Sequence, residues 1–260
     1  MKIVKIFGGL GNQMFQYSYA LLLKEQGYKV EIDTTYFDKT SNKYMLKYFD
    51  ISIPITTSRL RLLTYNMLSI FTNKIFSRSY GSYKIGYWQN IKYLPRKKTL
   101  NKEFNFKIYF SKYCLDVLKK IEKSNSVSVH VRRGDYLNKI NSRIYNNLDA
   151  KYYNDSFKLM DSKLNNPFYF VFSNDIDWAK KSIQNDNVFF VENKCLNNDI
   201  EDFFLMTSCK HNIIANSTFS WWAAFMNCNK SKLIVMPEKW FCNKNEFKNF
   251  DYFLENSVRL

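Results

Sequence analysis

The sequence predicts an α/β protein with a parallel sheet in each of two halves. Strand-like stretches alternate with amphipathic helical stretches, and only seven glycines and four prolines interrupt the 260 residues. The clearest unit is N-terminal: KIVKIF (2–7), a helical stretch (13–27) and KVEID (29–33) form a β-α-β pattern with short connections. Such connections join parallel strands, so each half is expected to carry a helix-covered sheet.

The same alternation returns in the second half of the chain. The expected strands are 126–131, 168–172, 188–191, 211–215 and 232–236, and the expected helices are 149–164, 175–183, 198–210 and 217–227. The middle of the chain is less regular, although 83–88 is compatible with a strand and 111–123 with an amphipathic helix. We place the division between two domains at 120/121.

The chain is strongly basic, with a formal net charge of +16 from 39 basic and 23 acidic side chains. This charge fits a solvated lysine-rich surface, or an anionic partner such as nucleic acid, an acidic membrane face or a phosphorylated substrate. The basic residues are spread along the chain without a recognition motif, so a nucleic-acid-binding protein is a remote alternative. The stretch 56–76 has helical apolar spacing with basic residues between, which fits a packed helix or a peripheral membrane contact.

Cysteine and histidine usage argues against a metal centre. The five cysteines are widely spaced without a CxxC pair, and there are two histidines. Buried free thiols in a reducing compartment are therefore expected. The N-terminus is patterned as a strand rather than a signal peptide, and no stretch reaches the roughly 18 apolar residues of a membrane span. We expect a cytoplasmic protein, with peripheral contact to the inner membrane face as a further hypothesis.

Four short polar motifs follow expected strands: GGLGN (8–12), HVRRGDY (130–136), FSND (172–175) and ANSTFSWW (215–222). Ligands of parallel α/β folds bind at the carboxyl ends of strands, and helix N-termini there favour anions. Each motif also has a purely structural interpretation, as a tight turn, an Arg–Asp pair or a helix cap. Trp221 and Trp222 are expected in the helix core.

The arginine pair of HVRRGDY predicts a division of roles. At the end of a strand, Arg132 and Arg133 point to opposite faces. We assign Arg132 to an anionic ligand, because a guanidinium can form two charge-assisted bonds to a phosphate. Arg133 or Asp135 is then expected to order the loop, and Asp135 is also a candidate general base.

GGLGNQMFQY, HVRRGDY, FSND and SCKHNIIANSTFSWW, in this order, resemble the bacterial α-1,2-fucosyltransferases of glycosyltransferase family 11. The resemblance implies a GT-B fold of two Rossmann-like domains facing a cleft, with the acceptor side in 1–120 and the GDP-sugar side in 121–260. It implies inverting transfer of L-fucose from GDP-fucose to the 2-hydroxyl of a galactose, without metal or other cofactor. A different acceptor or linkage, and a nonenzymatic GDP-sugar binder, remain open.

The resemblance also implies roles for individual residues. Arg132 matches an arginine that binds the donor β-phosphate. No carboxylate follows in 137–147, which leaves Asp135 and Asp33 as candidate bases. The implied partners are GDP-fucose and a galactose-containing oligosaccharide or lipid-linked glycan. The other implied donor contacts are Gly9, Gly11 and Asn12 at the diphosphate turn, His130, Asn174, Asp175 and Asp202 at the guanosine, and Ser217 and Thr218 on the phosphate side.

Overall fold

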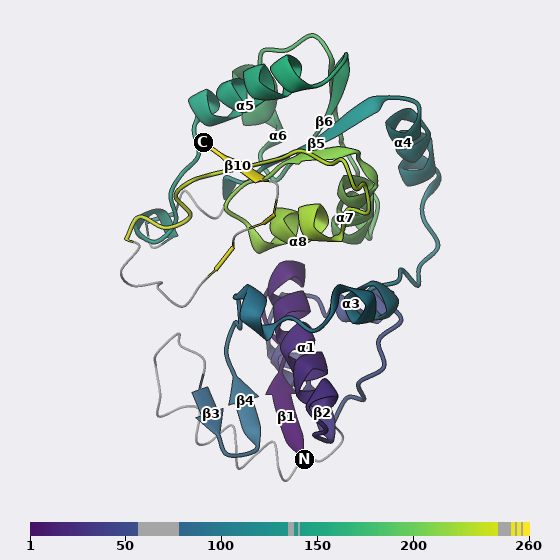
Figure 1. Cartoon of the computed structure of the whole chain (residues 1–260), viewed down its shortest axis with the longest axis vertical. Coiled ribbons are helices and arrows are strands. Elements are labelled where there is room, and N and C mark those ends of the chain that lie inside the picture. The colour runs from purple at the N-terminus through teal and green to yellow at the C-terminus, as the bar shows by residue number, and fades with distance from the viewer. Residues whose placement is uncertain (57–77, 135–137, 140, 244–250, 253, 256) are drawn as a thin grey trace. The chain divides into compact units, whose positions relative to one another are not determined.

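The computed structural model describes residues 1–56, 78–134, 138–139, 141–243, 251–252, 254–255 and 257–260 (Figure 1). The chain forms two compact units, which are the described residues of Met1–Ile108 with Asn249–Tyr252, and of Tyr109–Lys248 with Phe253–Leu260. The expected helix at 56–76 lies outside the described residues apart from its first position.

The first unit contains a four-stranded sheet in the order β2-β1-β4-β3. β1 is parallel to β2 and β4, whereas β3 is antiparallel to β4, which adds an edge hairpin that the sequence did not predict. The long helix α1 begins three residues earlier than expected. The elements are β1 (Lys2–Lys5), α1 (Leu10–Glu25), β2 (Val30–Asp33), β3 (Arg78–Tyr80), β4 (Tyr83–Ile85) and α3 (Lys97–Glu103).

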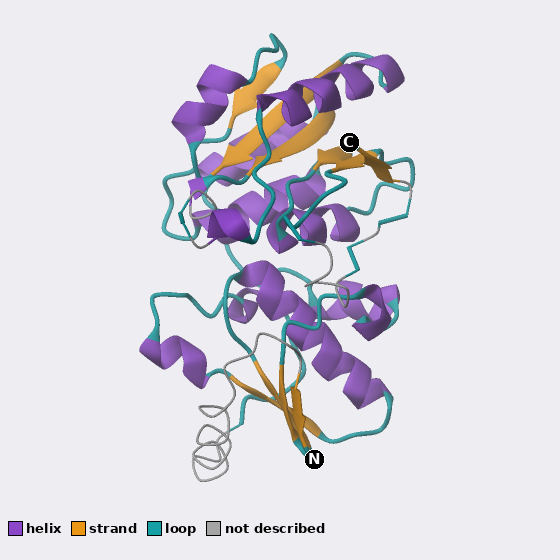
Figure 2. Cartoon of the chain, turned by 90° about the vertical axis from the view of Figure 1, so that its left-hand side faces the viewer, coloured by secondary structure: helices purple, strands orange, loops and turns teal. Residues whose placement is uncertain are grey.

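The second unit contains a six-stranded, fully parallel sheet in the order β10-β9-β8-β5-β6-β7. Helices cover both of its faces, as Figure 2 shows, so the central strands β5, β6, β8 and β9 are buried on both sides. The elements are α4 (Lys112–Glu122), β5 (Asn125–Val131), α5 (Ala150–Lys163), β6 (Pro167–Ser173), α6 (Ile176–Ser182), β7 (Val188–Phe190), α7 (Asn198–Ser208), β8 (His211–Ile213), α8 (Thr218–Met226), β9 (Ile234–Met236) and β10 (Ser257–Arg259).

The α/β class and the parallel sheets predicted from the sequence are confirmed, with most element bounds within two residues. The boundary between the two units falls between Ile108 and Tyr109, which is earlier in the chain than the expected boundary at 120/121. The reason is α4, which packs against α7 and β5 and therefore belongs with the second sheet. The acceptor and donor roles assigned to the two parts stay predictions.

Alternation along β5 divides its side chains between the two faces of the sheet. Val127, Val129 and Val131 are fully buried in the core beneath α5. His130 therefore points to the opposite face, where its ring lies 5.6 Å from that of Phe219 on α8. Trp221 and Trp222 are fully buried, as expected for core residues of α8.

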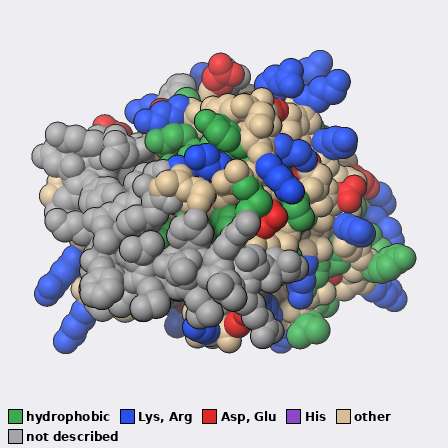
Figure 3. Space-filling model, turned by 90° about the horizontal axis from the view of Figure 1, so that it is seen from below, with side chains coloured by type: hydrophobic (Ala, Val, Ile, Leu, Met, Phe, Trp, Pro, Cys, Tyr) green, Lys and Arg blue, Asp and Glu red, His purple; other side chains and the backbone are tan. Residues whose placement is uncertain are grey.

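The distribution of basic side chains on the surface bears on the expectation of an anionic partner. On the face shown in Figure 3, lysine and arginine side chains are spread out rather than gathered into one patch.

All five cysteines are free, but Cys228 and Cys242 are exposed, so the expectation of buried thiols was wrong for these two. Among the residues that the structure describes, no helix is both long and apolar enough to cross a membrane.

Candidate functional site

The sheet of the second unit changes winding direction between β5 and β8. The chain proceeds outward through β5, β6 and β7, and then crosses to β8 on the other side of β5. In open α/β sheets, ligands bind outside the carboxyl ends of the strands at such a switch point. Three predicted motifs meet there, because HVRRGDY, FSND and ANSTFSWW follow the adjacent strands β5, β6 and β8. We call this the switch-point site.

Arg133 is fixed by contacts within the protein. Its guanidinium carbon lies 4.0 Å from the centre of the Trp178 ring, and its Nε is 3.5 Å from Oδ2 of Asp175. Its backbone N–H donates to Oδ1 of Asn174 at 2.9 Å. These contacts fit the loop-ordering role expected for Arg133, and they join the β5 loop to the start of α6.

Asn174 and Asp175, predicted to contact guanosine, have structural partners. Oδ1 of Asp175 accepts from the Trp178 N–H at 3.3 Å and so caps α6, the alternative that the sequence left open. Asn174 packs closely against Gly134, where an added Cβ would lie 2.3 Å from Nδ2 of Asn174. Contact of Asn174 and Asp175 with the donor stays a prediction. To make that contact, the two side chains would have to bind the donor while keeping the contacts within the protein.

His130 is a neutral imidazole in the switch-point site. Its side chain is 6% exposed. Burial, and secondarily the charge of Arg132, lower the His130 pKa to about 3. Its Nδ1 has no hydrogen-bond partner among the described residues. A buried neutral ring can donate or accept one hydrogen bond, which suits the edge of a nucleobase.

Asp202 stands one turn into α7 as a partly buried carboxyl. Asn193 donates its Nδ2 to Oδ1 of Asp202 at 3.4 Å. Burial raises the Asp202 pKa to about 7, helped by the charges of Asp199 and Glu201 and opposed by the Asn193 bond. A carboxyl poised near neutrality is a common feature of functional sites.

We expect the stability cost of ionising Asp202 to disappear in Asp202→Asn. Its folded pKa lies above its unfolded value near 4, so the wild type loses stability as pH rises from about 4 to 7. Relative to wild type, the variant should gain about 2 kcal/mol in unfolding free energy between pH 5 and pH 8. Urea titrations at the two pH values measure this change, and Asp186→Asn, at an exposed aspartate in the loop before β7, is the control. Equal gains for both variants would contradict the assignment.

The junction between β8 and α8 brings Ser217 and Thr218 to the same edge. Ser217 occupies the N-cap position of α8, but its side chain makes no cap hydrogen bond. A helix cap, one of the structural interpretations of this motif, is therefore not formed by Ser217. Asn216 donates its Nδ2 to the carbonyls of Asn146, at 2.7 Å, and Trp240, at 2.9 Å, which anchors the turn.

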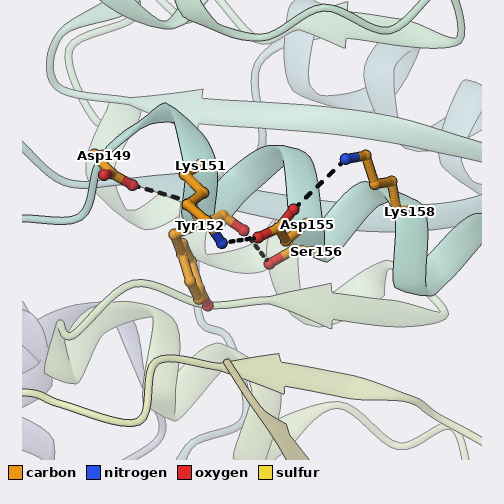
Figure 4. Close-up of polar contacts among 6 residues, drawn as sticks. All are labelled: Asp149, Lys151, Tyr152, Asp155, Ser156 and Lys158. Carbon is orange, nitrogen blue, oxygen red and sulfur yellow. Dashed lines mark hydrogen bonds and ion pairs between the residues drawn. The ribbon is translucent and has the colours of Figure 1, made fainter.

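Helix α5 holds this junction from the other face of the sheet. The hydroxyl of Tyr152 donates to the carbonyl of Ile214 at 2.6 Å. Figure 4 shows Tyr152 pointing away from α5, whose first turn is capped by Asp149 and whose exposed face carries the Lys151–Asp155 ion pair. The turn that leads into α8 is thereby fixed before any ligand binds.

The glycine turn of the first unit differs in part from its prediction. Gly8 has a φ of +77°, and exposed Gly9 precedes α1, so these two form the turn. Gly11 instead lies buried inside the first turn of α1. Asn12, predicted to contact the donor, accepts from Nε2 of Gln89 at 2.6 Å through its Oδ1. Nε2 of Gln13 donates to the Gly8 carbonyl at 2.8 Å.

Of the two candidate general bases, Asp33 and Asp135, the structure describes only Asp33. Asp33 is fully buried and accepts from the backbone N–H and hydroxyl of Thr35 and from the hydroxyl of Tyr83. These contacts favour a structural role, since a carboxylate without exposed surface cannot reach an acceptor hydroxyl. Asp135 lies outside the described residues. Among the residues described, no group of three His, Cys, Asp or Glu side chains is placed to hold a metal.

The supporting contacts of this site were not predicted. Trp178 beneath Arg133, Asn193 beside Asp202 and Phe219 against His130 all come from other strand ends or helices. Trp178 carried a usable signal, since it lies within the first turn of a helix whose cap, Asp175, was predicted. The other two follow only from the sheet order.

Two solved fucosyltransferase structures are similar in fold to this chain. NodZ from Bradyrhizobium aligns with a TM-score of 0.54 at 13% identity over 85% of this chain and 90% of that chain. An Arabidopsis thaliana FUT1 mutant in complex with GDP aligns with 0.51 at 9% identity, over 90% and 70%. At these identities the likeness shows the fold alone, which is the GT-B fold of nucleotide-sugar glycosyltransferases.

The sequence comparisons then define the family. Glycosyl transferase family 11 matches residues 1–256, and the chain belongs to this family. It is 32% identical to the Escherichia coli alpha-1,2-colitosyltransferase, over 99% of this chain and 98% of that protein. It is 31% identical to the Escherichia coli O-antigen biosynthesis glycosyltransferase WbnK, over 93% and 95%. The mouse galactoside 2-alpha-L-fucosyltransferase Sec1 is 25% identical, over 87% and 64%.

Proposed function

We propose that this glycosyltransferase moves L-fucose from GDP-fucose to the 2-hydroxyl of a terminal galactose, with inversion and without a metal. The observation that carries the proposal is the switch-point site, where Arg132 follows β5, the N-terminus of α8 follows the adjacent strand β8, and the buried His130 lies against Phe219 of α8. Such a site suits a nucleoside diphosphate, with positive groups for the phosphates and neutral polar groups for the base. A solved NodZ α-1,6-fucosyltransferase of this fold was soaked with GDP-fucose, which supports the donor class.

In this mechanism Arg132 acts on charge that develops during the reaction. As the bond between fucose and GDP breaks, negative charge gathers on the β-phosphate, and the Arg132 guanidinium and the N-terminus of α8 stabilise it. Stabilisation that grows toward the transition state raises kcat. Asp135 is the group we assign to take the proton of the acceptor hydroxyl.

A second donor is favoured by a specific observation, the 32% identity to an alpha-1,2-colitosyltransferase. Colitose is L-fucose without its 3-hydroxyl. A site that hydrogen-bonds this hydroxyl rejects the deoxy sugar by roughly 10⁴-fold, whereas an apolar pocket discriminates by roughly 10²-fold or less. The ratio of kcat/KM for GDP-fucose to kcat/KM for GDP-colitose therefore indicates whether the sugar pocket hydrogen-bonds the 3-hydroxyl or is apolar at that position.

The test measures GDP release from GDP-fucose and from GDP-colitose, with lactose or N-acetyllactosamine, with and without EDTA. We expect acceptor-dependent release that survives EDTA, an α-1,2 linkage in the product, and a higher kcat/KM for GDP-fucose. A higher kcat/KM for GDP-colitose would transfer the proposal to that donor. Loss of activity in EDTA that added metal restores would contradict metal independence, and binding without single-turnover transfer would leave a GDP-sugar binder.

The net charge motivates a further proposal about location, in which the protein meets lipid-linked acceptors at an anionic membrane face. It predicts co-sedimentation with vesicles containing anionic lipid but not with neutral vesicles, and a loss of binding in high salt. Equal binding to both kinds of vesicle would contradict it.

A further inference from the structure

Three aromatic rings gather at the carboxyl ends of three strands in the first unit. Phe7 follows β1, Tyr36 follows β2, and Tyr87 follows β4. The Phe7 ring lies 5.0 Å from that of Tyr87 and 6.0 Å from that of Tyr36, measured between centroids. All three side chains are half-buried, so each ring packs against its neighbours and also reaches solvent. We call these residues the aromatic platform.

The aromatic platform lies where a ligand of this sheet is expected. The chain passes from β1 to β2 on one side, and β4 pairs with β1 on the other, so the winding changes between β1 and β4. The platform surrounds the carboxyl end of this strand pair. Next to Phe7, the glycine turn leaves open space, because an added Cβ on exposed Gly9 would meet no atom within 4 Å.

The backbone that carries Tyr87 is held in a strained conformation. The next residue, Trp88, has a φ of +54°, which is rare for a bulky side chain. Its ring is stacked on Tyr19 at 3.8 Å between centroids. Gln89 follows, and it bonds both to Asn12 and to the hydroxyl of Tyr252. Strain of this kind persists where surrounding contacts enforce it, and it clusters at binding sites.

Tyr36 is held in a similar way. Nδ2 of Asn42 donates to its hydroxyl at 2.8 Å, and its ring meets that of Phe37 edge-on at 5.3 Å. The platform is therefore supported on both sides by contacts that need no ligand. Rigid aromatic side chains lose little conformational entropy on binding, which favours them as contact surfaces.

We infer that the aromatic platform binds the terminal pyranose of the acceptor through its apolar C–H face. The inference rests on the proposed function, since it supplies the acceptor contact that the function requires. The rings make interplanar angles of 60° and 56° with Phe7 and so present an angled surface. A puckered sugar ring fits such a surface, whereas a flat nucleobase stacks best on a single exposed ring face. Beside the platform, the carboxylate of Asp33 is already occupied by Thr35 and Tyr83, which fits a neutral ligand.

The experiment measures binding separately from catalysis. Saturation-transfer NMR with methyl β-galactoside and a panel of other methyl pyranosides is recorded for wild type, Tyr36→Leu, Tyr87→Leu and Tyr36→Phe. Tyr28→Leu is the matched control, because Tyr28 is an exposed tyrosine between α1 and β2, at the other end of the same sheet. The Kd for GDP is measured by calorimetry on each variant, and thermal unfolding shows whether each is folded.

We expect C–H signals of one pyranoside with wild type, Tyr36→Phe and Tyr28→Leu, and at least a fivefold loss with the two platform leucine variants, while the Kd for GDP stays unchanged. Undiminished signals in folded leucine variants, or no pyranoside signal with wild type, would overturn the inference. A rise in the Kd for GDP with unchanged pyranoside signals would also overturn it, in favour of a nucleobase surface. Pyranoside binding at the platform without any binding of GDP-fucose would overturn the proposed function alone.

Discussion

Arg132→Ala is expected to lower kcat by roughly 10²–10³ while the protein stays folded. If Arg132 meets the β-phosphate, its removal takes away a charge interaction that strengthens as GDP departs, and single donors of this type contribute about this much. The KM for GDP-fucose should change less than kcat, because the interaction is stronger in the transition state than in the ground state. Steady-state GDP release and single-turnover transfer measure both quantities.

Arg133→Ala is the control that separates charge chemistry from loop order. Arg133 stacks on Trp178 and pairs with Asp175, so its loss should cost about 1 kcal/mol of unfolding free energy. Arg133→Ala should lower kcat less than Arg132→Ala does. Arg132→Lys should recover only part of the activity, since an ammonium cannot form the two-pronged contact of a guanidinium. Near-wild-type kcat in Arg132→Ala would contradict the assignment of Arg132.

The strand ends of the second unit could be predicted because hydrophobic periodicity marks them directly. SVSVHV alternates and then stops at two arginines, which placed Arg132 and Arg133 at the carboxyl end of β5 without any structure. The same alternation puts His130 on the face opposite Val129 and Val131. Asp149 and Asp175 were predictable as helix caps, since a short acidic side chain before an apolar-periodic stretch is a local signal.

Features that depend on distant segments could not be predicted. Gly11 was placed in a turn because glycine usually breaks structure, yet here it lies within α1, whose later residues Gln13 and Gln16 bond the preceding loop and so extend the helix N-terminus. Asp33 looked like an available acid until its pairing with Tyr83, 50 residues later, was known. The aromatic platform is invisible in the sequence for the same reason, since sheet order alone brings Tyr36 and Tyr87 to Phe7.

Gly134→Ala is expected to disrupt the switch-point site although it removes no functional group. The new Cβ would lie 2.3 Å from Nδ2 of Asn174 and 3.2 Å from its Cγ, distances that require the amide to move. That amide cannot move without cost, because Oδ1 of Asn174 accepts the backbone N–H of Arg133, the residue after Arg132. We expect a 10- to 100-fold fall in kcat/KM for GDP-fucose, since small misplacements of catalytic groups have effects of this size.

A double-mutant cycle with Asn174→Ala separates displacement from a general loss of stability. Asn174→Ala removes the hydrogen bond to Arg133 but also the clash with residue 134. The double variant should therefore be no less active than Asn174→Ala alone, which would give a large favourable coupling between the two positions. If the losses of the single variants simply add, the defect of Gly134→Ala comes from elsewhere in the loop, and the close packing of Asn174 on Gly134 is not what positions Arg132.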